Sequence, residues 1–169
     1  MNKLLITLFL SFIYTCCYAQ SIEVCFTPGM DCRTKIIREI NNANKSIYVQ
    51  AYSFTDKYIA NALIKAINRG IDINVILDKT QKNSVLTKSL IKSHIEVSVD
   101  DKVAIAHNKV MIIDEKEVIT GSYNFTESAQ KRNAENLLII KDEKIAYKYL
   151  ENWFQREEVS KVLLGTNKK

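Results

Sequence analysis

Proline, glycine and histidine are scarce in this chain of 169 residues, which contains one, four and two of them respectively. There is no low-complexity tract and no internal repeat, so the sequence is not of the disordered or linker-rich type. Hydrophobic residues make up 47% and charged residues 25%, a composition typical of one globular domain with its own core. The net charge of +5 is spread along the chain, which permits a polyanionic partner without requiring one.

Metal ligands are sparse as well. The two histidines and four cysteines do not have the spacing of a zinc site. No group of carboxylates in the sequence suggests a catalytic metal either. We therefore expect neither a metal ion nor another cofactor.

The first nineteen residues have the layout of a secretory signal peptide. An apolar run from Leu4 to Tyr14 follows a single lysine, is short for a transmembrane span, and leads through small residues to Ala19. This pattern predicts a signal peptide over residues 1–19 and a mature domain of residues 20–169 that is exported, either periplasmic or secreted. An uncleaved membrane anchor is the alternative.

Cys25 and Cys32 are the two cysteines that remain once the predicted signal peptide is removed. They flank FTPGMD, a segment of turn-forming residues. An even number of cysteines in an oxidising compartment favours a disulfide between them. Two buried free thiols are the alternative.

Segments with strand and helix patterns alternate along most of the chain. Apolar residues recur on one helical stripe in segments such as 31–44, whereas the strand segments are short and rich in β-branched residues. Repeated strand–helix units predict an α/β fold, a single domain with a mixed, largely parallel β-sheet sandwiched between helices. Strands are expected near 21–26, 46–54, 71–78, 95–100, 109–114, 117–122 and 134–141, and helices near 31–44, 55–69, 82–93 and 143–156.

The stretch HNKVMIIDEKEVITGSYNF holds one of the two histidines beside a lysine and ends in a Gly-Ser-x-Asn segment. A neutral imidazole can attack phosphorus and carry the phosphoryl group between two half-reactions. The lysine, two residues along the same strand face, can neutralise phosphate oxygens, and the serine and asparagine can donate hydrogen bonds to them. The fixed positions of this pattern are His107, Lys109, Asp114, Gly121, Ser122 and Asn124.

The spacing HxKxxxxD followed by GSxN resembles the HKD signature of the phospholipase D superfamily, and every fixed position is matched. The segments VCFTPG, SIYVQAYSFT, NRGIDINVILD and GSYNFTESAQKRNAENLLII also resemble the small exported Nuc-type endonucleases of that superfamily, which carry a single motif. The similarity covers nearly all of residues 22–156. It implies the phospholipase D/nuclease fold and a phosphodiester hydrolase that works without a metal.

The resemblance implies a role for each motif residue. His107 would be the nucleophile that forms a phosphohistidine, and Lys109 and Asn124 would bind phosphate oxygens with help from Ser122. In this family a glutamate beyond the GSxN segment orients the nucleophilic histidine, and Glu135 holds the matching position. A carboxylate on Nδ1 would fix the tautomer of the imidazole and stabilise the imidazolium.

Other residues near the motif allow two interpretations. Asp114 could support the site from behind, or it could hold the turn between two strands. Lys131 and Arg132 could contact more distant phosphates, or they could form a solvated helix end. Tyr52 and Phe54 sit where a strand ends and could line the site or belong to the core, whereas His94, at a helix-to-strand junction, is expected to have a surface or capping role.

The sequence favours a sequence-nonspecific endonuclease acting on DNA or RNA. The alternative is a phospholipase D that hydrolyses membrane phospholipids such as phosphatidylcholine to phosphatidic acid. Lipid hydrolysis would favour an exposed apolar surface beside the site, and no such loop is evident outside the predicted signal peptide. A non-catalytic binding module would be expected to have lost His107 or Lys109, and both are present.

The single motif histidine also predicts a partner. Displacement at phosphorus needs a nucleophile and, on the opposite side of the phosphate, a general acid for the leaving oxygen. One imidazole cannot do both in the same step, and His94 lacks the lysine of the motif. We therefore expect a twofold homodimer in which His107 of each chain faces the other across one shared active site, with the GSYN segment at the interface.

Overall fold

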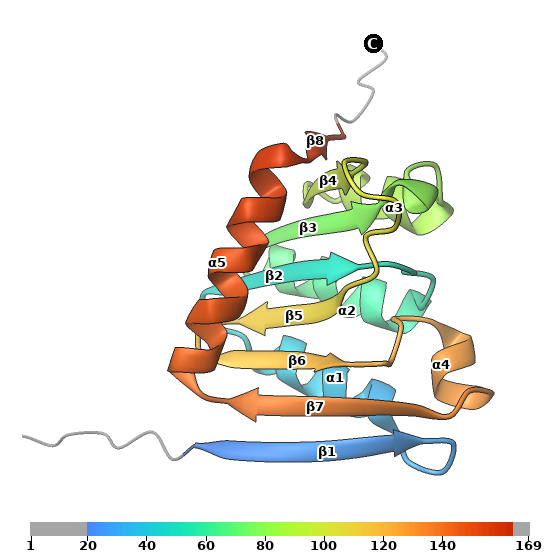
Figure 1. Ribbon diagram of the computed structural model, residues 1–169, viewed down its shortest axis with the longest axis vertical. Helices are drawn as coiled ribbons and strands as arrows, with labels where there is room; N and C mark the ends of the chain where they lie inside the picture. Colours follow the sequence, from blue (N-terminus) through green and yellow to red (C-terminus); the bar gives the residue numbers. More distant parts are fainter. Residues whose placement is uncertain (1–19, 164–169) are drawn as a thin grey trace, which may run out of the picture.

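The structure is a computed structural model that describes residues 20–163, so the predicted signal peptide lies outside the described residues. One sheet of eight strands carries helices on both faces (Figure 1). The elements are β1 (Ser21–Thr27), α1 (Cys32–Asn42), β2 (Ser46–Ala51), α2 (Lys57–Asn68), β3 (Asp72–Asp78), the 3₁₀ turn η1 (Lys79–Gln81), α3 (Val85–Lys92), β4 (Glu96–Asp100), β5 (Lys109–Ile113), β6 (Glu117–Gly121), α4 (Glu127–Lys131), β7 (Glu135–Lys141), α5 (Glu143–Val159) and β8 (Lys161–Val162). No helix among these residues is long and apolar enough to cross a membrane.

The strand order is β1-β7-β6-β5-β2-β3-β4-β8. The single-domain α/β fold and the mixed sheet are confirmed, but the expectation of a largely parallel sheet is wrong. Only the β2–β3 and β3–β4 pairs of the described sheet are parallel, and every other neighbouring pair is antiparallel. One reason is that β5 and β6 are joined by a tight turn, and so short a connection permits only antiparallel pairing.

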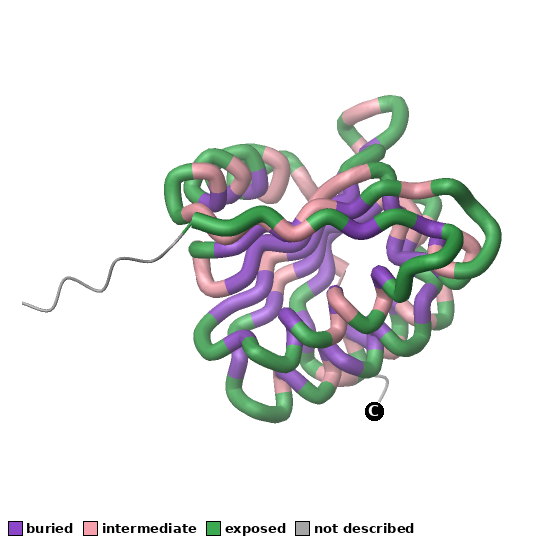
Figure 2. Tube along the Cα trace, turned by 90° about the horizontal axis from the view of Figure 1, so that it is seen from below, coloured by how far each residue is buried: buried purple, intermediate pink, exposed green. Residues whose placement is uncertain are grey.

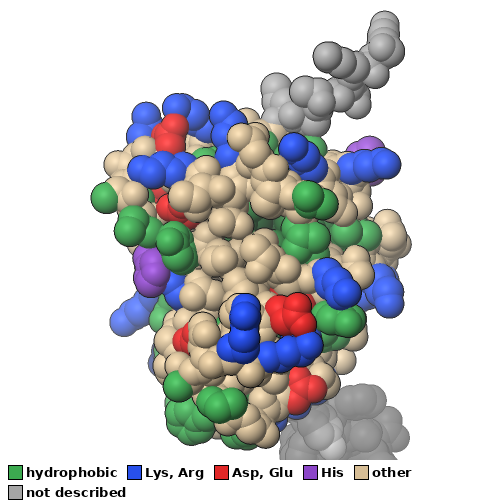
Figure 3. Space-filling model, turned by 90° about the vertical axis from the view of Figure 1, so that its right-hand side faces the viewer, with side chains coloured by type: hydrophobic (Ala, Val, Ile, Leu, Met, Phe, Trp, Pro, Cys, Tyr) green, Lys and Arg blue, Asp and Glu red, His purple; other side chains and the backbone are tan. Residues whose placement is uncertain are grey.

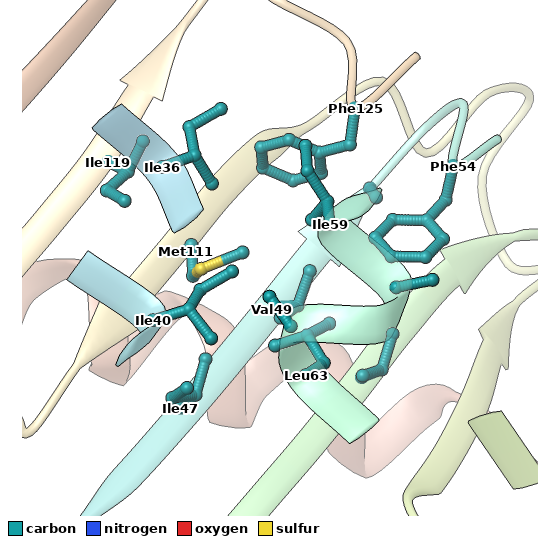
Figure 4. Close-up of a cluster of buried hydrophobic side chains, with 14 of the residues drawn as sticks. Ile36, Ile40, Ile47, Val49, Phe54, Ile59, Leu63, Met111, Ile119 and Phe125 are labelled. Atoms are coloured by element: carbon teal, nitrogen blue, oxygen red, sulfur yellow. The ribbon is translucent and has the colours of Figure 1, made fainter. Parts of the chain in front are cut away.

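The hydrophobic core lies in two layers on either side of the sheet. The larger layer packs α1, α2 and α3 against one face and contains fully buried side chains such as Ile36, Leu63 and Met111 (Figure 4). The smaller layer lies under α5, where Trp153 packs near Val110 and its Nε1 donates a hydrogen bond to a main-chain carbonyl of β2. Figure 2 shows the central strands buried between these layers.

The strand directions bring one end of several strands to a common edge. β2 and β6 end there, while their antiparallel neighbours β5 and β7 begin there, so Ala51 lies opposite Lys109 and Gly121 lies opposite Leu137. Segments far apart in the sequence therefore meet at the right-hand edge of the sheet in Figure 1, hereafter the site edge. This edge holds most of the motif residues.

A disulfide joins Cys25 in β1 to Cys32 at the start of α1, with 5.7 Å between the two Cα atoms. Both cysteines are buried. The bond closes the turn around FTPGMD and ties the edge strand to the first helix. The other two cysteines of the chain belong to the predicted signal peptide, outside the described residues.

A buried group of charges lies at the sheet end opposite the site edge. Lys141 of β7 contacts both Glu39 of α1 and Glu117 of β6, each at 3.1 Å. Burial, together with the neighbouring charge of Glu39, raises the pKa of Glu117 from 4.5 to about 7. Arg38 also pairs with Glu39, whereas Glu117 shares Lys141 with that second carboxylate, so Glu117 is the group that favours a bound proton.

We expect the stability of the fold to depend on pH through Glu117. A carboxyl whose pKa is raised in the folded state stabilises that state fully below the unfolded value of 4.5, and this contribution is lost as the pH rises through about 7. The free energy of unfolding should therefore fall by roughly 3 kcal/mol between pH 4.5 and pH 8. Urea titrations should show this decline in the wild type and a flatter profile for Glu117→Gln. Glu151→Gln, at an exposed position of α5, is the control, and an equally flat wild type would contradict the prediction.

Candidate active site

His107 lies in the segment between β4 and β5, with its side chain exposed at the site edge. Two backbone hydrogen bonds hold this segment. The N–H of Ala106 donates to Oδ2 of the buried Asp78 at 2.8 Å, and the N–H of Tyr52 donates to the carbonyl of Asn108 at 2.8 Å. The ends of β3 and β2 therefore fix the backbone on both sides of His107, and the Tyr52 ring lies 4.5 Å from the imidazole, centroid to centroid.

Lys109 is a buried cation beside this histidine, with only 8% of its surface exposed. Its Nζ donates to the carbonyl oxygen of His107 at 2.7 Å and lies 5.1 Å from the centroid of the Tyr52 ring. Burial lowers the pKa of Lys109 from its usual value, while the charge of Glu135 acts in the opposite direction. A positive charge shielded from water in this way interacts strongly with an anion that approaches it.

Gly121 lets β6 pass very close to β7. Its φ of +146° lies in the region that favours glycine, and a Cβ at this position would stand 2.2 Å from the carbonyl oxygen of Asn136. That same oxygen accepts hydrogen bonds from the N–H groups of Ser122 and Tyr123, at 3.0 and 3.3 Å. The close approach fixes the direction in which the GSYN segment leaves the sheet.

Ser122 contacts Glu135 just after this glycine, and Asn124 follows two residues later in the same segment. Ser122 Oγ donates to Glu135 Oε2 at 2.6 Å and accepts from the N–H of Asn136 at 3.0 Å. Oδ1 of Asn124 is buried without a hydrogen-bond partner among residues 20–163. Because Oδ1 is an acceptor, a phosphate oxygen cannot pair with it, and the amide nitrogen of Asn124 is the only atom of this side chain that could donate to one.

The structure does not place Glu135 on the imidazole of His107. The carboxylate of Glu135 accepts from Ser122 and from Nδ2 of Asn133, the latter at 2.9 Å, and within the described part of the chain no hydrogen bond joins it to His107. Glu135 is the first residue of β7 and is paired with Thr27 of the neighbouring strand β1, so the sheet fixes its position. Its electrostatic effect falls on Lys109 instead.

Comparison with known proteins identifies the family to which this chain belongs. The family description "Cardiolipin synthase, PLD-like domain" matches residues 36–157. A phospholipase D of Rickettsia prowazekii is 46% identical over 143 residues, which is 83% of this chain and 70% of that protein. The chain belongs to the phospholipase D superfamily. Members of this superfamily are phosphodiester hydrolases, so the protein is an enzyme of that class.

Two further proteins, one a solved structure and one a curated sequence, are also similar to this chain. The crystal structure of Nuc, a phospholipase D family member from Salmonella typhimurium, superimposes with a TM-score of 0.81 at 32% identity, covering 86% of this chain and 99% of Nuc. A mitochondrial cardiolipin hydrolase from Canis lupus familiaris is 30% identical over 132 residues, 76% of this chain and 52% of that protein. The first relative shares the whole domain, whereas the second is nearly twice as long as the matched part.

Asp114, the aspartate of the phospholipase D motif, lies away from the phosphate-binding groups. It follows the opposite end of β5, where its carboxylate accepts hydrogen bonds from the N–H groups of Asn44, Lys45 and Ser46 at 2.7 to 3.1 Å. Its backbone, with φ of +53°, starts the tight turn between β5 and β6. Of the two roles considered for Asp114, the structure supports holding the turn, and direct contact with a phosphate at His107 is excluded by its position.

Phe54 is fully buried in the core and does not line the site, whereas the remaining candidates of the sequence lie on the surface. Lys131 is exposed and pairs with Glu127 one helical turn earlier, and Arg132 donates to Ser128 Oγ, so both form a solvated end of α4. His94 is exposed, has a φ of +63° and follows the last residues of α3. Because β4 runs parallel to β3, His94 lies at the sheet end away from the site edge. Figure 3 shows the lysines and arginines of the site edge scattered rather than gathered in one patch.

Among residues 20–163 no three histidine, cysteine, aspartate or glutamate side chains are grouped so that they could hold a metal ion. The side chains whose contacts with His107 the structure shows are instead those of Lys109 and Tyr52. Sequence reasoning missed the part played by Asp78, whose carboxylate anchors the segment that carries His107. The feature of the sequence that could have pointed to Asp78 is that it is an acidic residue at the end of an otherwise apolar strand.

Tyr52 should matter for catalysis because its ring touches both His107 and Lys109. We expect Tyr52→Leu to lower kcat/KM by roughly 10- to 100-fold, since the imidazole loses the aromatic ring that packs 4.5 Å from it. Water would also reach Lys109, so its pKa should rise and the alkaline limb of the pH–rate profile should move to higher pH. Tyr52→Phe should keep both properties. A wild-type pH profile for Tyr52→Leu would contradict this role.

Proposed function

We propose that this enzyme cleaves phosphodiesters through a covalent phosphohistidine on His107. A ring nitrogen of the neutral imidazole attacks phosphorus, and the bond from phosphorus to the leaving oxygen breaks as that oxygen takes up a proton. Water then attacks the phosphohistidine, loses a proton, and releases a phosphomonoester with free His107. The exposed His107 beside the buried Lys109 is the observation that carries this proposal, because a nucleophile and a shielded positive charge share one opening.

The neighbouring side chains have roles in this reaction that follow from their positions. Lys109 neutralises the charge that builds on the non-bridging oxygens, and Asn124 donates to the same oxygens from its amide nitrogen. Ser122 donates its one hydroxyl proton to Glu135, so it anchors the GSYN segment and would donate to a phosphate oxygen only after turning away from that carboxylate. Glu135 fixes Ser122 through its 2.6 Å hydrogen bond and balances the charge of Lys109.

The proton for the leaving oxygen requires a second acid, which we propose is His107 of a second copy of the chain. The two imidazoles would lie on opposite sides of one phosphate, with one neutral and attacking while the other is protonated and donating. They would exchange roles when water enters. A twofold homodimer therefore carries one active site for each two chains.

We propose nucleic acid, DNA or RNA, as the substrate, cleaved without sequence preference. Support comes from the likeness to Nuc, whose entire domain this chain reproduces, and from the sequence resemblance to Nuc-type endonucleases. A phospholipid is the second candidate, because the Rickettsia relative is named a phospholipase D. We further propose that the protein is exported, on the basis of the predicted signal peptide and the disulfide of the mature domain.

The substrate can be decided by offering the mature protein plasmid DNA, RNA and phosphatidylcholine vesicles side by side. Nicked plasmid or degraded RNA with intact lipid is the expected result. Release of choline with intact nucleic acid would assign the phospholipase activity instead. The small diester bis(p-nitrophenyl) phosphate should be cleaved in either case, and its stability would overturn the proposed reaction.

Removal of divalent metal ions should leave the activity unchanged. We expect bis(p-nitrophenyl) phosphate to be cleaved at the same rate with and without about 10 mM EDTA. The reason is that Lys109 supplies the positive charge that a metal would otherwise provide. Loss of activity in EDTA with recovery on adding Mg²⁺ or Zn²⁺ would contradict this prediction.

A further inference from the structure

A hollow of about 100 Å³ lies at the site edge, where three helices begin. Arg33 is in the first turn of α1, and Lys57 and Glu127 are the first residues of α2 and α4. The residues that line the hollow are Arg33, Thr55, Asp56, Lys57, Tyr58 and Glu127. The lining includes no residue of the His107 motif, so the hollow is a separate feature of this edge.

The hollow lies close to the segment that carries Asn124. The N–H of Thr55 donates to the carbonyl of Phe125 at 2.9 Å, and Phe125 directly follows Asn124. Thr55 is also only three residues from Tyr52, a span of at most about 11 Å, and the Tyr52 ring lies 4.5 Å from the imidazole of His107. Successive phosphates of a nucleic-acid strand are about 3.4 Å apart along a helix axis, so the hollow lies within a few nucleotides of a phosphate bound at His107.

Arg33 brings a partly compensated positive charge to the hollow. Only 13% of its side chain is exposed, its Nε donates to Asp56 Oδ2 at 2.6 Å, and its Nη2 is buried without a hydrogen-bond partner among residues 20–163. The other carboxylate oxygen of Asp56 accepts from the N–H groups of Tyr58 and Ile59, so this fully buried acid is turned towards the start of α2. A shielded guanidinium with an unpaired nitrogen attracts an anion such as a phosphate group.

Lys57 adds a second cation to the same hollow. Its Nζ lies 5.2 Å from the centroid of the Tyr58 ring, and Cζ of Arg33 lies 4.9 Å from that centroid. Neither α1 nor α2 has an acidic residue in its first turn, and each carries one of these cations there, which is opposite to the charge that the helix dipole favours. The exposed acid of the lining, Glu127, pairs with Lys131. Helix stability therefore does not explain the two cations, whereas an anionic ligand does.

We propose that Arg33 and Lys57 bind a second phosphate of the substrate strand, beside the phosphate that His107 attacks. This inference rests on the proposed nucleic-acid substrate. A phosphodiester polymer carries several phosphates, so one can occupy the hollow while another lies at His107. Phosphatidylcholine carries a single phosphate, which cannot be in both places. The hollow is therefore a specificity site that favours a polymer over a phospholipid.

The test measures affinity for a fluorescein-labelled oligothymidylate of roughly ten nucleotides, in a His107→Asn background that prevents its cleavage. Lys57→Gln should weaken binding by roughly 3- to 10-fold and lower the slope of log affinity against log salt by about 0.7, the value for one phosphate contact on a single strand. Lys57→Glu should weaken binding further. Lys65→Gln, at an exposed position in the last turn of the same helix, is the matched control and should change neither quantity.

A second measurement uses the enzyme with His107 intact. Lys57→Gln should lose roughly 3- to 10-fold more kcat/KM on the oligonucleotide than on bis(p-nitrophenyl) phosphate, because the small diester has only one phosphate. Lys65→Gln should show no such difference between the two substrates.

Other outcomes would overturn the inference in distinguishable ways. Equal affinity and salt slope for Lys57→Gln and Lys65→Gln would remove the hollow as a phosphate site, while cleavage of the oligonucleotide by the wild type would leave the proposed function standing. A wild type that hydrolyses bis(p-nitrophenyl) phosphate but neither binds nor cleaves the oligonucleotide would remove both the nucleic-acid substrate and this inference. If Lys57→Gln slowed choline release from phosphatidylcholine vesicles as much as it slowed cleavage of the oligonucleotide, the hollow would not select a polymer and the inference would be wrong.

Discussion

Replacement of His107 by asparagine is expected to abolish turnover while leaving the fold intact. Asparagine cannot form the covalent bond to phosphorus, and loss of a nucleophile typically costs a factor of 10⁴ or more in rate, by a rough comparison with hydrolases that act through a covalent intermediate. The side chain is exposed and its imidazole makes no hydrogen bond in the described structure, so its removal should change the thermal midpoint little. Hydrolysis of bis(p-nitrophenyl) phosphate, followed beside a thermal melt, measures both quantities.

Two further variants test whether the effect is specific to the site. Lys109→Ser should be equally inactive, because the phosphate oxygens lose the shielded charge that lies beside His107. His94→Asn should keep the wild-type rate, because that histidine lies at the far end of the sheet. An inactive but folded His94→Asn would show that the site has been misplaced.

Gly121→Ala is expected to cause the largest loss of stability among single substitutions at the site edge. The added Cβ would stand 2.2 Å from the carbonyl oxygen of Asn136, a main-chain atom of the paired strand that cannot turn aside. Backbone strain at φ of +146° adds to this clash, and together they should cost on the order of 3–5 kcal/mol. Urea unfolding measures the loss, and activity should fall with the displaced GSYN segment.

Gly70→Ala is the matched control for this substitution. Gly70 also has a positive φ, of +88°, but a Cβ there would meet no atom within 4 Å. Its cost should be limited to backbone strain, about 1 kcal/mol. If Gly121→Ala were no more destabilising than Gly70→Ala, the close approach of β6 and β7 would not be a requirement of the fold.

Interactions between residues close in the sequence were predictable, and those between distant segments were not. The proximity of His107 and Lys109 follows from their spacing of two residues, although His107 lies just before β5, and the structure shows it in the contact of Lys109 with the His107 carbonyl. Asp114 also belongs to the motif, yet a strand of five residues separates it from the site, and only the partners Asn44 and Ser46 reveal its role. A motif fixes spacing along the chain, whereas the direction of each side chain depends on the neighbouring strand.

The sequence alone determined the superfamily, the α/β class, the nucleophile candidate and the pair of cysteines, because each depends on residue types at short separations. The tertiary structure decided the strand order, the place of Glu135 beside Ser122 rather than His107, and the contact of Tyr52 with the nucleophile. It also showed that Val24 and Phe26 of β1 are exposed while Cys25 between them is buried. All three residues are apolar, so the sequence pattern does not tell which side of the strand faces the core. The physical reason is that strand pairing joins residues more than a hundred positions apart, such as Thr27 and Glu135, and no local pattern specifies which strands become neighbours.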